Sequence, residues 1–171
     1  MDRLRDVHSA GYTFLDLKPD NILIGDASGK EKHKIRLIDF GLCQKYKDNE
    51  GNHLPLQKVN EFRGNFIFAS VYAFHLVTQG RRDDLISLCY LLVYLLDGDV
   101  PFIFNQIINK YEAFEKTKCI KNTITASKLC VSPESKLLQP FVKEVFIMDY
   151  DMEPEYEKLK SLLVKSLMEN E

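Results

Sequence analysis

The sequence predicts a mainly α-helical fold with one small β-hairpin. Apolar residues recur at helical spacing through residues 102–168, and the nearly continuous apolar run at 84–96 has the length of a helix that is buried on all sides. Two short apolar runs, 22–24 and 35–38, enclose a polar loop that contains Gly and Ser, which is typical of a hairpin. The helical second half is therefore expected to supply the core.

Length and composition indicate one globular domain, residues 1–171. The chain is 45% hydrophobic and 28% charged, with a net charge of -2, and a chain of this size can bury about two thirds of its unfolded surface. This charge balance gives no overall attraction to nucleic acid or to an anionic membrane. We therefore expect neither nucleic acid nor a membrane among the partners.

The cysteines and histidines match no disulfide framework or zinc site. No two cysteines form a Cys-x-x-Cys motif and the chain begins without a secretory-type leader, so we expect reduced thiols and an intracellular location. The histidines lie far apart and are expected to be surface or packing residues. The residues concerned are Cys43, Cys89, Cys119, Cys130, His8, His33, His53 and His75.

The first half of the chain is expected to be organised around the hairpin. Residues 2–9 show helical spacing and are followed by Gly11, which can adopt the left-handed conformation that ends a helix. The hairpin would then bring Asn21 and Asp39 together at one end. Residues 42–70 are polar and irregular, and so long a loop in a compact domain is usually functional. The alternative is a surface excursion without a role.

A buried helix is predicted at residues 84–96. Its run is apolar on nearly every face, which is typical of a helix in the core, and it is too short for a bilayer, which needs about 20 apolar residues. Asp83 or Asp84 would be its N-cap, and Gly98 lies near its end.

Amphipathic helices are predicted through the remainder, residues 102–168. A second one spans 137–146, with Pro140 at its start or at a kink, and a last one spans 156–167, with Pro154 in its first turn. The first carries four apolar residues at helical spacing, Phe104, Ile107, Ile108 and Tyr111. Lysines on and after this first helix are expected to form a solvated face, namely Lys110, Lys116, Lys118 and Lys121.

One short stretch concentrates groups that suit phosphoryl transfer. This chemistry uses a carboxylate that orients a hydroxyl, an ammonium that neutralises phosphate and an amide that holds Mg²⁺. Asp16, Lys18 and Asn21 supply one of each. A second metal-binding carboxylate, Asp39, stands in an Asp-Phe-Gly sequence directly after the second strand of the hairpin.

Each of these pieces alone is also ordinary structure. Lys-Pro-Asp-Asn is common in turns, and Asp-Phe-Gly can simply end a strand. Their occurrence together, in this order and with only a hairpin between them, favours a phosphoryl-transfer site.

Together the motifs resemble the C-terminal lobe of a eukaryotic protein kinase, and the casein kinase I family most closely. The matching segments are the catalytic loop at 14–21, Asp-Phe-Gly-Leu at 39–42, Lys-Tyr-Lys-Asp at 45–48, His-Leu-Pro at 53–55, Ala-Ser at 69–70 and Arg-Arg-Asp-Asp-Leu at 81–85. The long loop 42–70 corresponds to the activation and substrate loop of such kinases, and we call it the substrate loop. The resemblance covers residues 2–165 and is strongest up to Pro101.

The resemblance implies a serine/threonine protein kinase, cytoplasmic or nuclear, that transfers the γ-phosphate of ATP to a protein substrate with the help of Mg²⁺. Asp16 would be the catalytic residue that orients the substrate hydroxyl and accepts its proton, and Lys18 would contact the γ-phosphate. Asn21 and Asp39 would hold Mg²⁺ and, with Lys18, bind the nucleotide phosphates. Asp84 would support the catalytic loop from beneath.

The chain departs from the family pattern at three places. The His-Arg that usually precedes the catalytic Asp is Phe14-Leu15, which removes a cation that can anchor a phosphorylated loop. The Thr that follows the loop Gly is Asn65, which we expect to hydrogen-bond toward Asp16. The family's pocket for phosphorylated substrates has an Arg where this chain has Ile67, so a preference for such substrates does not carry over.

The sequence contains no Gly-x-Gly, and the strand Lys and its Glu partner of a kinase N-terminal lobe have no counterpart. We therefore expect a kinase-like C-terminal lobe with the N-terminal lobe absent. Two other hypotheses stay open, a catalytically inactive kinase-derived module that binds proteins and a truncated gene copy. An absent lobe would leave apolar surface on the upper face, where a covering partner is expected.

Overall fold

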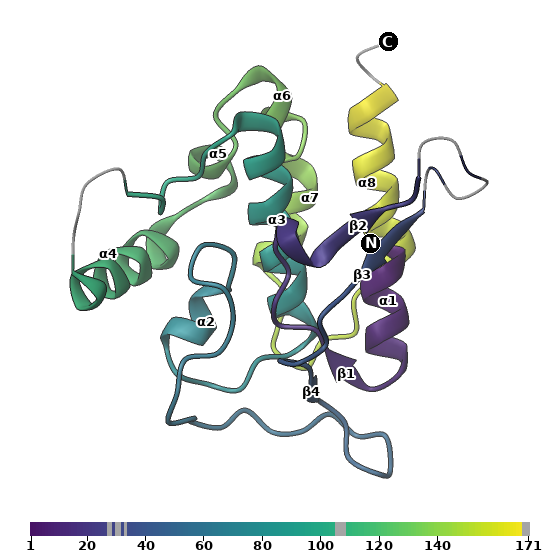
Figure 1. The fold of residues 1–171 in the computed structure, drawn as a ribbon, viewed down its shortest axis with the longest axis vertical. Coiled ribbons are helices and arrows are strands. Elements are labelled where there is room, and N and C mark those ends of the chain that lie inside the picture. Colours follow the sequence, from purple (N-terminus) through teal and green to yellow (C-terminus); the bar gives the residue numbers. More distant parts are fainter. Residues whose placement is uncertain (27–28, 30–31, 33, 105–108, 169–171) are drawn as a thin grey trace.

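The computed structural model describes the chain except for residues 27–28, 30–31, 33, 105–108 and 169–171. The described part is mainly helical, with two separate two-stranded antiparallel sheets (Figure 1). The strands are β1 (Tyr12–Thr13), which pairs with β4 (Gln44–Lys45), and β2 (Ile22–Ile24), which pairs with β3 (Ile35–Leu37). The helices are α1 (Asp2–Ser9), α2 (Val71–Phe74), α3 (Arg81–Asp97), α4 (Lys110–Thr123), α5 (Ala126–Leu129), α6 (Pro133–Lys136), α7 (Gln139–Phe146) and α8 (Tyr156–Met168), and Pro19–Asn21 form one 3₁₀ turn.

Helix α3 runs through the centre of the fold. Its first eleven residues are all buried, and it packs against α6 and α7. Figure 1 shows α1 and α8 on the opposite side of α3 from α4 and α5. The prediction of a helix buried on all sides is therefore confirmed, and the helix is longer at both ends than the predicted 84–96.

The predicted N-cap of α3 is wrong. The helix begins at Arg81 with Gly80 as N-cap, and Asp83 lies inside the first turn. The Asp83 carboxylate accepts a hydrogen bond from the Gly80 amide at 2.7 Å, so it caps the helix from the third helical position. A Cβ at residue 80 would lie 2.7 Å from the carbonyl oxygen of Tyr150, which explains why a glycine occupies the cap position. At the other end, the helix stops at Gly98, as expected, and this glycine takes the left-handed conformation.

The catalytic loop is part of the hydrophobic core. Phe14 and Leu17 belong to the same buried cluster as Leu85 of α3 and Phe141 of α7. Because these side chains are anchored in the core, the backbone of the loop has little freedom to move.

The predicted hairpin is confirmed. β2 and β3 pair antiparallel, with Ile22 opposite Leu37 and Ile24 opposite Ile35. Just beyond the paired strands the Ile38 amide donates a hydrogen bond to the Asn21 carbonyl at 3.0 Å. Asn21 and Asp39 therefore lie at the same end of the hairpin, as the sequence indicated. The β1–β4 pairing was not predicted, because two-residue strands leave no alternating pattern.

The substrate loop follows a defined path along the surface. Besides β4, isolated bridges join Lys47 to His53 and Lys58 to Val77. The Leu54 amide also donates to the Tyr46 carbonyl at 2.8 Å. These contacts agree with the expectation of a long ordered loop.

The first amphipathic helix of the second half begins later than predicted. Asn109 is the N-cap of α4, and its side-chain oxygen accepts a hydrogen bond from the Glu112 amide at 2.9 Å. Phe104 is not helical, and the predicted positions Ile107 and Ile108 lie outside the described residues. The helix therefore starts where a capping side chain is present.

The prediction of a solvated lysine face on α4 is wrong for one residue. Lys110 and Lys116 are exposed and Lys118 is half-buried, but Lys121 is only 4% exposed. The last turn of α4 faces the end of the substrate loop and aromatic side chains of α2 and α3, so a side chain placed there is enclosed.

The remaining helices, α5 to α8, pack around α3 and α1. The four-residue helices α5 and α6 were not predicted, because so short a helix leaves no periodic pattern. Pro140 begins α7 rather than kinking a longer helix. Pro154 precedes α8 by two residues rather than lying in its first turn. Lys160 of α8 and Asp2 of α1 form an ion pair at 2.9 Å, which holds the two terminal helices side by side (Figure 1). In the described part of the chain no helix has the length and apolar character to cross a membrane.

Candidate active site

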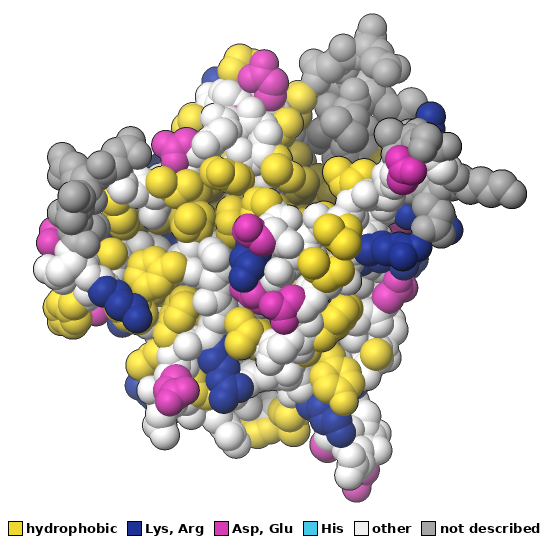
Figure 2. All heavy atoms as spheres, viewed as in Figure 1, with side chains coloured by type: hydrophobic (Ala, Val, Ile, Leu, Met, Phe, Trp, Pro, Cys, Tyr) yellow, Lys and Arg dark blue, Asp and Glu magenta, His cyan; other side chains and the backbone are white. Residues whose placement is uncertain are grey.

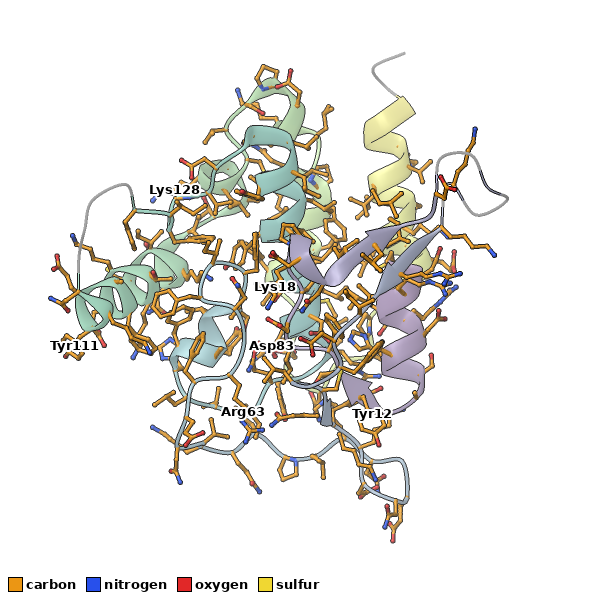
Figure 3. The ribbon with its side chains drawn as sticks, viewed as in Figure 1. Tyr12, Lys18, Arg63, Asp83, Tyr111 and Lys128 are labelled. Atoms are coloured by element: carbon orange, nitrogen blue, oxygen red, sulfur yellow. The ribbon has the colours of Figure 1, made fainter. Side chains whose placement is uncertain are left out.

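The catalytic loop leaves β1 and ends in the 3₁₀ turn that leads into β2. Pro19 occupies the first position of this turn, where its fixed φ suits a helical start and its missing N–H costs nothing. Lys18 just before it is extended, with φ -154° and ψ 162°. In Figure 3 Lys18 lies near the middle of the molecule, beside the start of β2.

Three of the four predicted site residues meet at the Asp16 carboxylate. The Lys18 ammonium donates to Asp16 Oδ2 at 2.7 Å, and the Asn21 amide donates to the same oxygen at 2.8 Å and to the Asp16 carbonyl at 2.9 Å. Asp16 and Asn21 are both 5% exposed. Both hydrogen bonds of Asn21 use its amide nitrogen, so a cation would take its amide oxygen.

The fourth predicted residue, Asp39, lies at the edge of this cluster. Its side chain is exposed and accepts one hydrogen bond, from the Gly41 amide at 3.1 Å. The hydrogen bond from Lys18 to Asp16 raises the pKa of the lysine above its ordinary value, and the negative charges of Asp16, Asp20 and Asp39 raise it further. Lys18 is therefore the cation shared by the carboxylates of this site.

A buried carboxylate supports the catalytic loop from beneath. Asp84, the fourth residue of α3, accepts hydrogen bonds from the Phe14 amide at 2.7 Å and the Leu15 amide at 2.8 Å. His8 Nε2 donates to the same carboxylate at 2.8 Å, and its other ring nitrogen contacts the Tyr156 hydroxyl at 2.6 Å. The loop, α1, α3 and α8 are thus joined through one network, as the resemblance implied for Asp84.

His8 was expected to be a surface or packing residue, and it is buried. Sequence spacing could not show its role, because its partners Asp84 and Tyr156 lie 76 and 148 residues away. The one local signal is its place on the apolar face of residues 2–9.

Two residues of the site adopt the left-handed backbone conformation that side chains usually avoid. Leu15 has φ 65° and Asp39 has φ 60°. Such conformations persist where surrounding contacts impose them, and they occur often at functional sites. The contacts are the Asp84 carboxylate at Leu15 and the hydrogen bond from Gly41 at Asp39.

The end of the substrate loop lies against the catalytic loop. Gly64 has φ 121°, and a Cβ there would lie 3.1 Å from the Leu15 carbonyl oxygen. Asn65 does not hydrogen-bond toward Asp16 as expected. Its side-chain oxygen instead accepts from the amides of Ile67 and Phe68, at 2.9 and 3.1 Å. Asn65 therefore shapes the loop itself.

A second carboxylate of α3 holds the end of the substrate loop. The Ser70 hydroxyl donates a short hydrogen bond to the Asp83 carboxylate, whose other oxygen accepts from Gly80. Burial raises the pKa of Asp83 to about 6, because desolvation outweighs the two donors. Adjacent carboxylates of one helix turn thus serve different loops, Asp84 the catalytic loop and Asp83 the substrate loop.

The oxygen atoms at this site fit a magnesium ion that is shared with a phosphate. Within the described residues no group of three or more His, Cys, Asp or Glu side chains could hold a metal ion by itself. Mg²⁺ usually takes one or two protein oxygens and completes its shell with phosphate and water. The exposed Asp39 carboxylate and the Asn21 amide oxygen suit that role.

Comparisons with known proteins agree with this geometry. The model of the protein kinase domain family matches residues 1–170. The chain belongs to this family. Relatives place it close to casein kinase I. It is 36% identical over 161 residues to the casein kinase 1-like protein HD16 of Oryza sativa subsp. japonica, covering 93% of this chain and 22% of that protein. It is 28% identical over 171 residues to casein kinase I homolog 2 of Schizosaccharomyces pombe, covering 99% and 39%.

The chain spans less than half the length of both relatives. The resemblance to a casein kinase I-like kinase is confirmed by these matches. Activity, substrates and partners of the longer proteins are not established for this chain by likeness alone.

Proposed function

We propose that this chain is a casein kinase I-like serine/threonine kinase lobe whose site transfers the γ-phosphate of ATP to a hydroxyl of a protein substrate. The observation that carries the proposal is the convergence of Lys18 and Asn21 on the buried Asp16 carboxylate, with Asp39 at the edge of the same site. These are the groups that phosphoryl transfer needs, and the fold holds Lys18 and Asn21 within hydrogen-bonding distance of Asp16.

Asp16 acts as the catalytic residue. Its carboxylate accepts a hydrogen bond from the substrate hydroxyl and takes the proton as the oxygen bonds to the γ-phosphorus, while the bond from that phosphorus to the bridging oxygen breaks and ADP leaves. Lys18 donates to the transferred phosphoryl group. Its ion pair with Asp16 places its ammonium beside the reacting hydroxyl. Asn21 and Asp39 would hold Mg²⁺, which would neutralise charge on the phosphates when bound.

The substrate hydroxyl enters a site that is ready formed on the protein side. Asp16 needs no rearrangement to meet it, because Asn21 fixes the carboxylate and Asp84 fixes the backbone before it. Leu15 stands where related kinases carry an Arg, so activation through a phosphorylated loop residue bound to that Arg is not part of the proposal.

A reducing compartment fits the thiols. All four cysteines of the chain are free, and two of them, Cys89 and Cys130, are buried, where burial raises the thiol pKa. Together with the family resemblance, this supports a cytoplasmic or nuclear location.

The test is phosphate transfer by the purified chain. Incubation with radiolabelled ATP, Mg²⁺ and casein is expected to label the protein substrate on Ser or Thr. Asp16→Asn should lower the rate by at least about a hundredfold, the order of a lost general base, whereas Asp149→Asn, an exposed carboxylate far from the loop in sequence, should leave it unchanged. Equal labelling by Asp16→Asn, or none by the unaltered chain, would overturn the proposal.

The second candidate function is a protein-binding module without turnover. Large apolar side chains of the hairpin, the Asp-Phe-Gly segment and the end of α3 are exposed, among them Ile24 at 74%, Leu95 at 61% and Phe40 at 55%. Figure 2 shows hydrophobic surface above and beside the charged side chains at the centre of this face. Exposed apolar surface of this kind favours a partner that covers it.

Nucleotide binding separates the two functions. In a thermal unfolding experiment with ATP and Mg²⁺, the kinase proposal predicts a rise in melting temperature that Asp39→Asn abolishes, because bound ligand stabilises the folded state. A module without a nucleotide site would show no rise in either protein.

A further inference from the structure

The ammonium group of Lys121 lies in an enclosed site behind the substrate loop. Its Nζ donates to the carbonyl oxygens of Ile67 at 2.7 Å, Ala69 at 2.5 Å and Phe66 at 3.5 Å. All three acceptors belong to the turn at residues 64–70 of the loop, and the lysine reaches them from the last turn of α4, more than 50 residues away in sequence.

The site suits a cation although it contains no counter-ion. No carboxylate of the described residues pairs with Lys121, and burial lowers its pKa well below the ordinary value. The aromatic rings around Lys121 favour its charged form and so oppose this lowering of the pKa. The ring centroids of Phe102, Tyr90 and Phe74 lie 4.3, 4.7 and 4.9 Å from Nζ. Three carbonyl dipoles and three ring faces are what an ammonium with three donors can use.

The turn that Lys121 holds is the part of the substrate loop that touches the catalytic loop. At its start Gly64 approaches the Leu15 carbonyl, and at its end Ser70 is bonded to Asp83 of α3. Between these points the local hydrogen bonds all go to Asn65, which itself belongs to the turn. Lys121 therefore ties the middle of the turn to the helical body by hydrogen bonds, beside the ring contacts that Phe66 makes with Phe74 and Phe114 and that Phe68 makes with Tyr94.

We propose that Lys121 is a positioning residue for the substrate loop: it holds the carbonyls of Phe66, Ile67 and Ala69 so that the turn stays packed beside the catalytic loop and presents a fixed surface to the protein substrate. The part that concerns substrate rests on the proposed kinase function. The part that concerns the position of the turn is independent of that function.

The first experiment measures amide hydrogen exchange. Lys121→Met keeps the length and apolar stem of the side chain but removes every donor, and Lys116→Met is the control, because Lys116 is exposed on the same helix. In Lys121→Met the amides of Ile67, Phe68 and Ala69 are expected to exchange at least about tenfold faster, with the core of α3 and α7 unchanged. Lys121→Arg, which keeps donors and charge, should recover most of the protection.

Each outcome of the exchange experiment either supports or overturns the positioning role of Lys121. Unchanged exchange in residues 64–70 of Lys121→Met would overturn the proposal, and so would a uniform rise over the whole chain, since that would make Lys121 a residue of general stability. If Lys121→Met does not fold, Lys121→Gln, whose side chain is one bond shorter and uncharged, decides by the same criterion: faster exchange confined to 64–70 supports the proposal, and uniform or unchanged exchange overturns it.

The second experiment measures kinetics. If the unaltered chain transfers phosphate, Lys121→Met should raise KM for a peptide substrate about tenfold and leave KM for ATP within about twofold. An equal loss for both substrates would overturn the substrate part. If the unaltered chain transfers no phosphate, the kinase proposal fails while the exchange experiment still judges the positioning role.

Discussion

The catalytic loop and the β2–β3 hairpin are consecutive in the chain, but they are built in opposite ways. Residues 14–17 of the loop are at most 5% exposed, and their backbone is bonded to a buried carboxylate. The hairpin exposes half or more of Leu23, Ile24 and Ile35. The catalytic loop, which would orient the substrate hydroxyl, is therefore fixed by the core. The hairpin end, which would contact the metal ion and the nucleotide, lies next to apolar surface that is exposed among the described residues.

The largest effect is expected from removing the support of the fixed half. Asp84→Ala leaves the amides of Phe14 and Leu15 and the His8 ring without their buried acceptor, which should lower the free energy of unfolding by about 3 to 5 kcal/mol. Urea unfolding followed by circular dichroism measures it. Asp6→Ala removes a carboxylate of an exposed ion pair on α1 and should cost less than about 1 kcal/mol. Equal losses would mean that Asp84 is not the support described above.

The neighbouring carboxylate, Asp83, should make the free energy of unfolding depend on pH. The pKa of Asp83 is raised to about 6 from 3.8, so the folded protein holds this proton more tightly than the unfolded chain. Its contribution to stability is full below pH 3.8 and is lost as the pH rises through about 6. This difference corresponds to about 3 kcal/mol.

The measurement compares the unaltered chain with Asp83→Asn, which resembles the neutral form at every pH. Between pH 4 and pH 7 the unaltered chain should lose about 2 kcal/mol of unfolding free energy relative to the variant, because part of the difference is already lost at pH 4. Parallel pH profiles would show that folding does not raise the pKa of Asp83.

A smaller effect should come from the contact between the two loops. Gly64→Ala places a Cβ 3.1 Å from the Leu15 carbonyl at φ 121°, which should cost about 1 to 3 kcal/mol. Gly51→Ala is the matched control, because Gly51 also has positive φ, 89°, but nothing lies within 4 Å of an added Cβ. If both variants lose the same stability, the cost comes from backbone conformation alone and the close approach to the catalytic loop contributes nothing.

The smallest effect on stability is expected at the open half. Leu23→Lys and Leu95→Lys replace half-exposed or more exposed side chains and should change the unfolding free energy by less than about 0.5 kcal/mol. They should also reduce self-association in sedimentation velocity, because they divide the apolar surface. Leu91→Lys, on the buried face of the same helix as Leu95, should prevent folding. If Leu23→Lys and Leu95→Lys leave self-association unchanged, the apolar surface responsible for it lies elsewhere.

Local patterns in the sequence were reliable where local chemistry decides the structure. The hairpin, the start of α1 and the turn of residues 16–21 follow from strand runs, helical spacing and a proline, all of which act between near neighbours. Asp16, Lys18 and Asn21 were expected together because a turn of this length leaves them little room to part. Asp39 could be placed near them since the pairing of the two strands, set by their hydrophobic pattern and the turn, brings the residues before β2 and after β3 to one end of the hairpin.

Predictions that depend on distant partners were less reliable. The N-cap of α3 is Gly80 because Tyr150 approaches it, and α4 begins at a capping Asn rather than at the first apolar residue. Lys121 was expected on a solvated face because lysines usually lie there. Its burial depends on three carbonyls of another segment and on rings of α2, α3 and the segment that follows α3.

By itself the sequence determined which chemical groups stand within a few residues of one another, and so the kind of reaction the site suits. Only the tertiary structure decided what holds those groups still: Asp84 under the catalytic loop, Asp83 at the end of the substrate loop and Lys121 behind its turn. The reason is physical. Hydrogen bonds across 13 to 70 residues exist only after the core has brought both ends together, and no spacing along the chain encodes them.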